Sequence, residues 1–402
     1  MATKEFSFAD LNKEMNKISE YGDTMDKSTI SEIDHYISTG NYMLNACLTA
    51  SLFGGYPNNR AICLAGPSGT GKTFLTLNAV KQAQSMGYSI IYYDSENAVD
   101  RALVEKFSID TSAFRYEPCN TVQEFRTSVT NLTDMLIAQK KKGVELPKIM
   151  IVLDSAGNLA TQKEIDDAKT GADKSDMTRA KLLKSTFRIL MTKLGICKIP
   201  FIFTNHTYMT NEMFAKEVGG GGTGPEYAAS IILFLAKAKL KDGNDAKEQT
   251  GIIVTAKPNK NRFAKPSPIK FHISFNKGMN PYVGLEEFIS WDNCGIERGK
   301  LLADREWLKL SPADQAECRP HTYTEDDKEV TVYFQPSGTA RSLCVQHLNG
   351  TVPLNQLFTS KVITAEVLQR LEPIISAKYR YSTEELNDES LLEVLDHDAE
   401  EN

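Results

Sequence analysis

From residue 61 onward, short apolar runs alternate with helical stretches, and this alternation constrains the fold more than any other feature of the sequence. The runs are almost continuously apolar and lie at 61–65, 90–93, 149–153, 200–204, 231–235 and 251–256. Continuous apolarity over about five residues is what a strand buried on both faces requires. Helices between such strands imply right-handed crossovers and a largely parallel sheet. The sequence therefore predicts an α/β core with a mostly parallel central sheet.

Smaller parts are expected on either side of this core. A chain of 402 residues holds two or three domains at ~150 residues each. We predict an N-terminal helical oligomerisation motif at 1–34, the core at 35–285, a small α+β C-terminal domain at 286–380 and an acidic flexible tail at 381–402. The first contains an amphipathic helix over 7–20 that Ser7 can cap. The third contains two short strands within 322–334 and helical stretches near 353–358 and 363–377.

One long helix and two segments without periodicity are predicted between the core strands. The helix covers 177–194 and can end at Gly195. Its inward-facing residues are Leu183, Phe187, Leu190 and Leu194. The aperiodic segments, 161–176 and 207–223, are expected to be loops that interrupt the core.

Composition excludes several classes of protein. A hydrophobic content of 41% and a charged content of 24% are ordinary for a globular chain, so it is neither wholly disordered nor collagen-like. The formal net charge is −6, but nine acids and no Lys or Arg lie within 381–402; without them 46 basic residues face 43 acidic ones. Such a tail is expected to compete with nucleic-acid phosphates or to attract basic partners.

The seven cysteines form no Cys-x-x-Cys pair, so no zinc site or disulfide framework is expected, and Cys63 is expected to be a core residue. With no apolar run of 18 residues and no signal-peptide h-region, we expect a cytoplasmic location and no membrane partner.

A glycine-rich segment directly follows the first predicted strand and precedes a helix. It reads Gly66, Pro67, Ser68, Gly69, Thr70, Gly71, Lys72 and Thr73. The glycines let the backbone wrap closely around phosphate with several N–H groups turned inward, and the helix N-terminus adds positive potential. In this setting Lys72 is expected to reach the β and γ phosphates of ATP, and the Thr73 hydroxyl to ligate Mg²⁺.

Carboxylates follow two of the other predicted strands. Asp154 ends the run at 149–153, at the sheet edge where ligands bind, and is expected to support Mg²⁺ directly or from the next shell. A helix-capping role is the alternative for Asp154. Hydrolysis needs a group that positions and polarises water against the γ-phosphate, and either Asp94 or Glu96 can serve from the next strand end. Spacing favours Glu96, and a solvated loop carboxylate is the alternative.

These residues and those that follow resemble the RecA family of recombinases, and within it the phage UvsX-type branch. The likeness runs from about 35 to 285. Besides 66–73, it rests on the strings at 94–96, 154–160, 175–181, 204–208 and 219–225. The string Asn205-His206-Thr207-Tyr208, followed by a Gly-rich loop that ends Thr223-Gly224-Pro225, is particularly specific to that branch.

The resemblance implies a RecA-like ATPase core that forms ATP-dependent helical filaments on single-stranded DNA. It implies homologous pairing and strand exchange with double-stranded DNA, in recombination, repair and recombination-dependent replication. It also implies DNA-dependent ATP hydrolysis with Mg²⁺ and, as partners, a mediator protein and a single-strand-binding protein.

Site residues follow from the same resemblance. Lys72 and Thr73 take the phosphate and magnesium positions, Glu96 takes that of the catalytic glutamate, and Asp154 that of the second acidic magnesium-site residue. His206 occupies the place of a polar sensor that reports the γ-phosphate to the following loop. The alternative for His206 is a satisfied histidine at a strand end.

Two positions depart from the pattern of the family. Where several relatives have an aromatic residue for adenine, this chain has Leu103, which is expected to support the base instead. Where relatives have a Lys-x-Lys pair that reaches the nucleotide of the neighbouring subunit, this chain has Lys260 and Arg262. Two cations that enter across an interface would act like arginine fingers, although a planar guanidinium replaces the second ammonium group. A solvated basic loop is the alternative.

The DNA-binding surface is predicted on and around the two aperiodic segments. Exposed apolar side chains on a flexible loop are available for base stacking, and glycine amides can approach phosphate. The residues assigned to DNA binding are Lys169, Lys174, Arg179, Tyr208, Met213, Phe214, Lys216, Gly219, Gly220, Gly221 and Gly222. A disordered surface loop is the alternative for both segments.

The N-terminal helix is predicted to take part in assembly. The string that contains Phe6, Phe8 and Ala9 is similar to the Phe-x-x-Ala element by which some relatives hook a neighbouring core. Packing of the helix onto its own core is the alternative.

Other functions remain open from the sequence. A RecA-like hexameric helicase would share the phosphate loop, Glu96 and Asp154 but form closed rings; the pattern from His206 to Pro225 argues against it. A scaffold that uses ATP only as an assembly switch would hydrolyse it negligibly. A small-molecule kinase lacks an acceptor-site signature.

Overall fold

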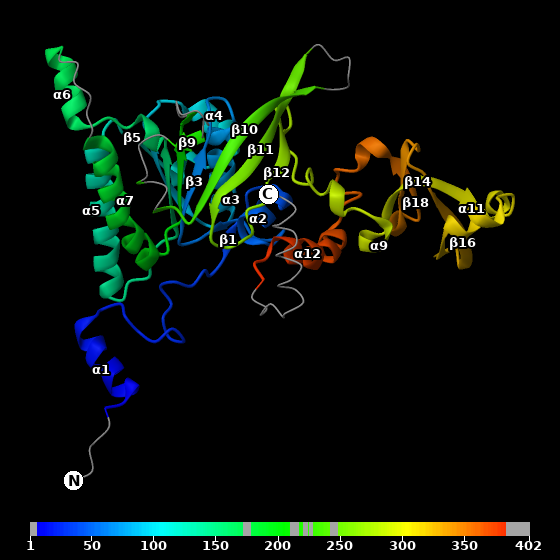
Figure 1. The fold of residues 1–402 in the computed structure, drawn as a ribbon, viewed down its shortest axis with the longest axis horizontal. Coiled ribbons are helices and arrows are strands. Elements are labelled where there is room, and N and C mark those ends of the chain that lie inside the picture. Colours follow the sequence, from blue (N-terminus) through cyan, green and yellow to red (C-terminus); the bar gives the residue numbers. More distant parts are fainter. Residues whose placement is uncertain are drawn as a thin grey trace, which may run out of the picture.

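The computed structural model describes residues 6–171, 178–209, 217–219, 224, 228–241 and 248–382, and Figure 1 shows a large core beside a smaller C-terminal module. The core is built on a nine-stranded sheet with the order β13-β12-β11-β10-β3-β7-β6-β4-β5. Its strands are β3 (Ala61–Ala65), β4 (Ser89–Asp94), β5 (Phe114–Pro118), β6 (Ile149–Asp154), β7 (Phe201–Asn205), β10 (Ile231–Lys241), β11 (Gln249–Asn261), β12 (Ile269–Ser274) and β13 (Gly278–Met279).

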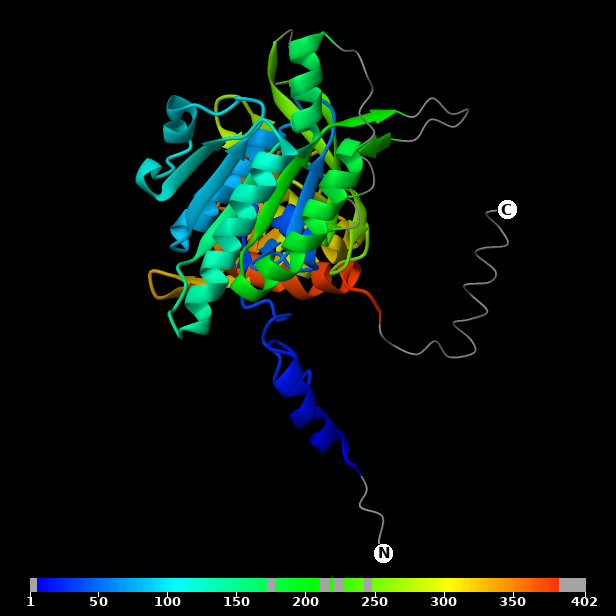
Figure 2. The same cartoon turned by 90° about the vertical axis from the view of Figure 1, so that its left-hand side faces the viewer.

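Helices cover both faces of this sheet, as Figures 1 and 2 show. One face carries α2 (Tyr42–Thr49), α3 (Lys72–Ser85) and α4 (Arg101–Lys106); the other carries α5 (Val122–Lys141) and α7 (Thr178–Cys197). Alternate residues of one strand point to opposite layers: Ile62 and Leu64 pack with the first set of helices, whereas Ala61, Cys63 and Ala65 pack with the second. Burial on both faces explains why these strands are apolar throughout. The predicted α/β class is confirmed.

The sheet is parallel over six strands and antiparallel at one end. From β10 through β3, β7, β6 and β4 to β5, every neighbouring pair is parallel. β10 and β11 pair antiparallel along their whole length, from Ile231 opposite Asn261 to Lys241 opposite Gln249. β10 runs well beyond the predicted 231–235, and β11 runs beyond 251–256 at both ends. The apolar pattern missed these extensions because polar residues interrupt it, among them the exposed Lys237, Lys239, Lys241 and Lys257.

Three sequence predictions near α7 need correction. Helix α7 passes through Gly195 and ends at Cys197, because Leu194, Ile196 and Cys197 are all buried and keep its last turn packed on the core. Part of the segment expected to be a loop at 161–176 forms α6 (Gln162–Thr170), which Thr161 and Glu164 start with a reciprocal capping box and Gly171 ends. The base of the other segment is a hairpin of β8 (Thr207–Met209) and β9 (Glu217–Gly219).

The C-terminal module contains a five-stranded antiparallel sheet with the order β15-β16-β14-β17-β18. Its strands are β14 (Ile296–Ala303), β15 (Arg319–Glu325), β16 (Lys328–Pro336), β17 (Ser342–Val345) and β18 (Gly350–Pro353), with short helices α9 (Trp291–Cys294), α10 (Asp304–Trp307) and α11 (Pro312–Glu317). The predicted strand pair around 326–328 is confirmed, and Asp326 and Asp327 turn between the strands with positive φ. The stretch predicted near 353–358 is only a short 3₁₀ turn.

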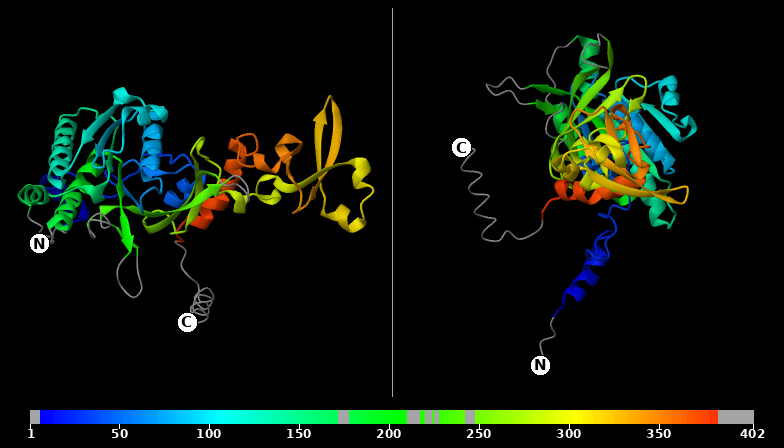
Figure 3. Two further views of the ribbon diagram at one scale, coloured as in Figure 1. Left: turned by 90° about the horizontal axis from the view of Figure 1, so that it is seen from above. Right: turned by 90° about the vertical axis from the view of Figure 1, so that its right-hand side faces the viewer.

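The last helix, α12 (Ala365–Tyr379), returns to the core, as the left view of Figure 3 shows. It packs beside α2, and the Glu372 carboxylate accepts hydrogen bonds from the Ser51 hydroxyl at 2.6 Å and the Leu52 N–H at 2.7 Å. Its Val367, Leu368, Leu371 and Ile375 join the same apolar cluster as the core helices. The C-terminal module is therefore anchored to the core through its final helix.

At the opposite end of the chain, α1 (Phe8–Ile18) projects away from the core in Figures 1 and 2. Ser7 caps it as predicted, in a reciprocal capping box with Asp10. None of its side chains is buried, and its apolar stripe of Phe8, Leu11, Met15 and Ile18 faces solvent. Within the described residues, no helix is long and apolar enough to span a membrane.

Candidate nucleotide and DNA site

The phosphate loop joins β3 to α3 at the carboxyl edge of the parallel strands, as predicted. Gly69 and Gly71 have φ of +74° and +90°, the left-handed region that favours glycine. A Cβ at Gly66 would lie 2.5 Å from the Leu235 carbonyl oxygen, so this position also requires glycine. The Gly66 N–H donates to the Asn205 carbonyl oxygen at 3.1 Å, which ties the loop to the end of β7.

Lys72 is the first residue of α3, and its ammonium group is turned back onto the loop. It donates to the carbonyl oxygens of Gly66 at 2.7 Å and Pro67 at 3.0 Å. Burial lowers the pKa of Lys72, while the charges of Glu96 and Asp154 act in the opposite direction. Carbonyl oxygens are acceptors like those of a phosphate, so the position of this ammonium group fits an oxyanion in the loop.

Thr73 and Asp154 are brought together as predicted. The Thr73 hydroxyl donates to Asp154 Oδ2 at 2.7 Å, and Asp154 is only 1% exposed. A hydroxyl and a carboxylate side by side are the oxygen donors that Mg²⁺ takes, with nucleotide phosphates and water to complete its shell. These two residues therefore fit a magnesium ion. Elsewhere in the described ranges, no group of three or more His, Cys, Asp or Glu side chains is placed to hold a metal ion by itself.

Two further hydroxyl groups reach Asp154 that sequence reasoning missed. Tyr92 from β4 donates to Oδ2 at 2.9 Å, and Thr204 from β7 donates to Oδ1 at 2.5 Å. Both lie on interior strands of the sheet, and the apolar sequences of these strands do not indicate that the two hydroxyl groups belong to a site.

Glu96 lies on the loop after β4, between two partners from other strands. Its Oε1 accepts from the Ser155 hydroxyl at 2.6 Å and lies 2.8 Å from His206 Nε2. Burial by itself would raise the pKa of Glu96, but the hydrogen bonds from Ser155 and His206 and the nearby positive charges outweigh it and lower the pKa. Glu96 is thus held as an anion at the ligand edge of the sheet.

Asp94, the other carboxylate left open by the sequence, faces inward. It is buried, and its two oxygens accept the N–H groups of Glu96 at 2.9 Å and Val99 at 3.1 Å. Its bonds shape the loop that carries Glu96, so the geometry supports Glu96 as the group that acts on the ligand.

His206 connects this carboxylate to the hairpin. It follows β7 directly and precedes β8, whose Tyr208 is 56% exposed. A single residue therefore separates the imidazole that contacts Glu96 from the exposed phenol of the hairpin. The predicted sensor position is consistent with this placement and remains a prediction.

Three residues with predicted nucleotide contacts lie apart from the cluster around the phosphate loop and Glu96. They are Leu103, predicted to support adenine, and Lys260 and Arg262, predicted to reach the nucleotide of a neighbouring subunit. Leu103 lies on α4, half-buried against the core. Lys260 pairs across the sheet with Ile232, which pairs with Cys63 in the middle of β3, and Arg262 lies beyond the end of β11. Because β11 runs antiparallel, its end lies towards the start of β3, whereas the phosphate loop follows the other end of β3. The register therefore directs Lys260 and Arg262 away from the loop of their own chain.

Arg262 joins a cationic cavity that the sequence did not predict. A cavity of about 310 Å³ is lined by Lys184 and Arg188 of α7 together with Met191, Gly224, Ala228 and Arg262. Lys184 and Arg188 are four residues apart and lie on one face of α7. Their proximity to Arg262, more than 70 residues later in the sequence, needed the fold.

The predicted DNA-binding residues are spread over α6, α7 and the hairpin. Lys169 on α6 forms an exposed ion pair with Asp166 at 3.0 Å. Arg179, in the first turn of α7, donates to the Gly157 carbonyl oxygen. Gly219 ends β9 opposite Thr207. Lys174, Met213, Phe214, Lys216, Gly220, Gly221 and Gly222 lie outside the described residues, as does the tail from 383 onward.

The predicted oligomerisation residues are accessible. Phe6 is 68% exposed and Phe8 is 71% exposed, and Ala9 is also exposed. No side chain of α1 is buried by any residue that the structure describes.

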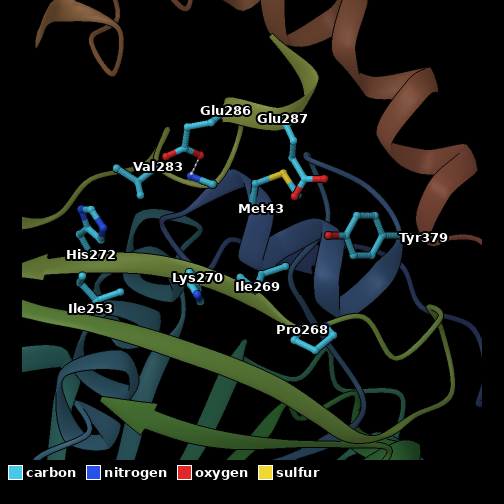
Figure 4. Close-up of a pocket in the computed structure, with 11 residues that line it drawn as sticks. Met43, Ile253, Pro268, Ile269, Lys270, His272, Val283, Glu286, Glu287 and Tyr379 are labelled. Carbon is cyan, nitrogen blue, oxygen red and sulfur yellow. Dashed lines mark hydrogen bonds between the residues drawn. The ribbon is translucent and has the colours of Figure 1, made fainter. Parts of the chain in front are cut away.

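A separate cavity of about 530 Å³ lies between β11, β12, α2 and the start of the C-terminal module (Figure 4). Met43, Ile269 and Val283 supply apolar walls, and Glu286 and Glu287 stand at one rim. None of the residues that line it was predicted to be functional, and it does not include the phosphate loop.

The fold and the loop geometry define a phosphate-loop nucleotide-binding protein with a mostly parallel sheet. Residues 6–280 match the RecA N-terminal domain family, and the chain belongs to the RecA family. It is 35% identical over 246 residues to the recombination and repair protein of Enterobacteria phage T4, an alignment that covers 60% of each chain. It is 29% identical over 259 residues to protein RecA of Streptomyces rimosus, covering 63% of each. The chain thus spans about 60% of the length of these curated relatives.

Proposed function

We propose that this chain is an ATP-dependent recombinase that assembles as a helical filament on single-stranded DNA and catalyses homologous pairing and strand exchange. Membership of the RecA family and likeness to a phage recombination and repair protein support the class of activity. DNA-dependent hydrolysis of ATP with Mg²⁺ and a homo-oligomeric assembly belong to the same proposal. A mediator and a single-strand-binding protein are the expected partners.

The observation that carries the proposal is the contact between Glu96 and His206. It joins the carboxylate proposed to position the hydrolytic water to the residue that begins the hairpin with Tyr208. A change at the γ-phosphate that moves Glu96 would therefore alter the base of the segment assigned to DNA. This contact supplies a physical route from nucleotide state to DNA binding.

Each residue of the site has a defined task. Backbone amides of the phosphate loop and Lys72 bind the phosphates, while Thr73 and Asp154 would hold Mg²⁺, which neutralises charge that develops on them. Glu96 orients the water, and Ser155 and Asp94 keep Glu96 in place. Lys260 and Arg262 serve the nucleotide of a neighbouring subunit, since the strand register turns them away from their own loop.

Lys184 and Arg188, which line the cationic cavity beside Gly224, extend the proposed DNA surface, whereas Arg262 in the same cavity keeps its proposed role at the nucleotide of the neighbouring subunit. Three cations from α7 and the end of β11 gather beside Gly224, which follows the glycine run. Phosphate is the ligand that such a cluster favours. Binding to DNA is accordingly expected to weaken steeply with salt.

Electron microscopy with single-stranded DNA and a slowly hydrolysed ATP analogue tests the proposal. Open helical filaments with extended DNA are the expected result. Closed rings would overturn it in favour of a RecA-like helicase.

Lys72→Ala tests the nucleotide assignment. It should abolish nucleotide-dependent assembly and DNA-stimulated hydrolysis, measured as phosphate release, because the ammonium group in the loop is lost. Lys81→Ala, which changes an exposed lysine of the same helix, is the matched control and should behave as the wild type. Retention of both activities in Lys72→Ala would mean that the loop does not bind the nucleotide.

A further inference from the structure

Tyr92 is a fully buried tyrosine whose hydroxyl reaches the proposed magnesium site. It lies on β4 and is 0% exposed, and its ring stacks on Phe114 of β5 with centroids 5.4 Å apart. The hydroxyl lies 2.9 Å from Asp154 Oδ2 and 3.4 Å from the Thr76 hydroxyl. Stacking and burial fix the direction of the ring, so the hydroxyl has little freedom to point elsewhere.

The Tyr92 hydroxyl is the donor of this hydrogen bond, and Asp154 Oδ2 is the acceptor.

Asp154 depends on such donors because it is buried. A carboxylate removed from water needs hydrogen bonds to both oxygens. It receives them from Thr73 on α3, Tyr92 on β4 and Thr204 on β7. These three elements approach Asp154 from different directions.

The three donors are not equivalent. Thr73 is itself a proposed magnesium ligand, so its hydroxyl has a competing use when the ion is present. Tyr92 and Thr204 have no such role in the site. They are the two hydroxyl groups that can hold Asp154 in either state.

We propose that Tyr92 is a positioning residue for the magnesium site, whose hydroxyl fixes the orientation of Asp154 for the Mg²⁺–nucleotide complex. This inference rests on the proposed ATPase function and adds a residue from the interior of the sheet to that site. Groups that orient metal-site carboxylates typically change metal affinity 10- to 100-fold when they are removed.

The test compares Tyr92→Phe with Tyr56→Phe in the full chain. Both substitutions remove one hydroxyl from a fully buried ring, but the Tyr56 hydroxyl has no hydrogen-bond partner within the described part of the chain. Binding of a fluorescent, non-hydrolysable ATP analogue is titrated with Mg²⁺ and measured separately in EDTA. Thermal melting shows that each variant is folded.

The expected result is a rise of about 10-fold or more in the Mg²⁺ concentration for half-maximal binding in Tyr92→Phe, with unchanged affinity in EDTA. Tyr56→Phe should titrate as the wild type. Thr204→Val, which removes the donor to the other oxygen, should shift the titration in the same direction and serves as the second variant if Tyr92→Phe does not fold.

Three outcomes would overturn the inference. They are a wild-type Mg²⁺ titration in Tyr92→Phe, an equal shift in Tyr56→Phe, and an equal loss of affinity in EDTA, which would mean a general structural effect. If the wild-type protein bound no nucleotide under either condition, the ATPase assignment would fail, and the role of Tyr92 with it.

Discussion

At the scale of single residues, the site divides into side chains that face the ligand and side chains that hold them. Lys72, Thr73 and Glu96 lie at the open edge of the sheet. Asp94 and Ser155 are buried behind Glu96, and their hydrogen bonds fix the loop and the carboxylate. A residue of the first kind is expected to change chemistry when it is substituted, whereas one of the second kind changes the geometry of its neighbour.

Glu96→Gln should lower DNA-stimulated hydrolysis by about 10²- to 10⁴-fold, because the amide cannot polarise a water molecule as the carboxylate does. Nucleotide-dependent assembly on DNA should persist, since Lys72 and the loop amides are intact. Phosphate release and filament imaging measure the two properties. Glu105→Gln, an exposed position on α4 paired with Arg101, is the control. Undiminished hydrolysis in Glu96→Gln would favour an ATP-dependent scaffold over an ATPase.

At the scale of secondary-structure elements, α1 stands out because its hydrophobic stripe is not buried by any part of the chain that the structure describes. Unless another surface buries the stripe, only the capping box and contacts between neighbouring side chains stabilise such a helix. The core of a second copy is the surface that a filament would supply.

Deletion of residues 1–25 should leave a folded nucleotide-binding core that assembles poorly. The melting temperature should change little, because none of the α1 side chains is buried. Filament length on single-stranded DNA, measured by electron microscopy, should fall sharply. A milder pair, Phe6→Ser with Phe8→Ser, should act in the same direction. Filaments of the truncated chain that match the wild type would refute the assembly role.

The elements also show why some local predictions were wrong. Glycine lowers helix stability by about 1 kcal/mol relative to alanine. The helix was therefore predicted to end at Gly195. Burial of the residues around it, including Leu194 and Ile196, outweighs that preference. In the segment from 161, the capping box between Thr161 and Glu164 was present in the sequence, but a polar helix with no buried face shows too little periodicity to be recognised.

At the scale of the whole molecule, the core and the C-terminal module share one apolar cluster through α12. Trp291 packs on Phe334, and Trp307 stacks on Tyr333 with ring centroids 4.3 Å apart, so both tryptophans are packing residues of the module. The seven cysteines all lie in the described part of the chain, are buried, form no disulfide and are distributed over both parts.

These thiols make local opening measurable. Burial raises the pKa of Cys47, Cys119 and Cys344 to about 12, so at pH 8 they are neither ionised nor accessible. The native protein should therefore resist iodoacetamide at pH 8, whereas the denatured chain should be fully labelled, as read by peptide mass spectrometry. If the module opens separately from the core, Cys344 should label before Cys47. Rapid labelling of all sites in the native protein would contradict the described packing.

Much of the fold and part of the site follow from local sequence patterns. The six predicted core strands, the phosphate loop and the positions of Asp154 and Glu96 are all encoded within a few residues of chain. Buried parallel strands require continuous apolarity, and a phosphate loop requires glycines at fixed positions, so these features leave a signature that can be read directly.

Contacts between distant segments were decided only by the tertiary structure. The sequence does not show that Tyr92 and Thr204 donate to Asp154, that His206 meets Glu96, or that Arg262 lies beside Lys184 and Arg188. The contacts of Asp154 and Glu96 depend on strand order and register, which bring residues tens to more than a hundred positions apart to the carboxyl edge of the sheet, and the contact of Arg262 depends on how α7 packs beside the end of β11. Local composition determines which elements form, whereas the packing of those elements determines which side chains meet.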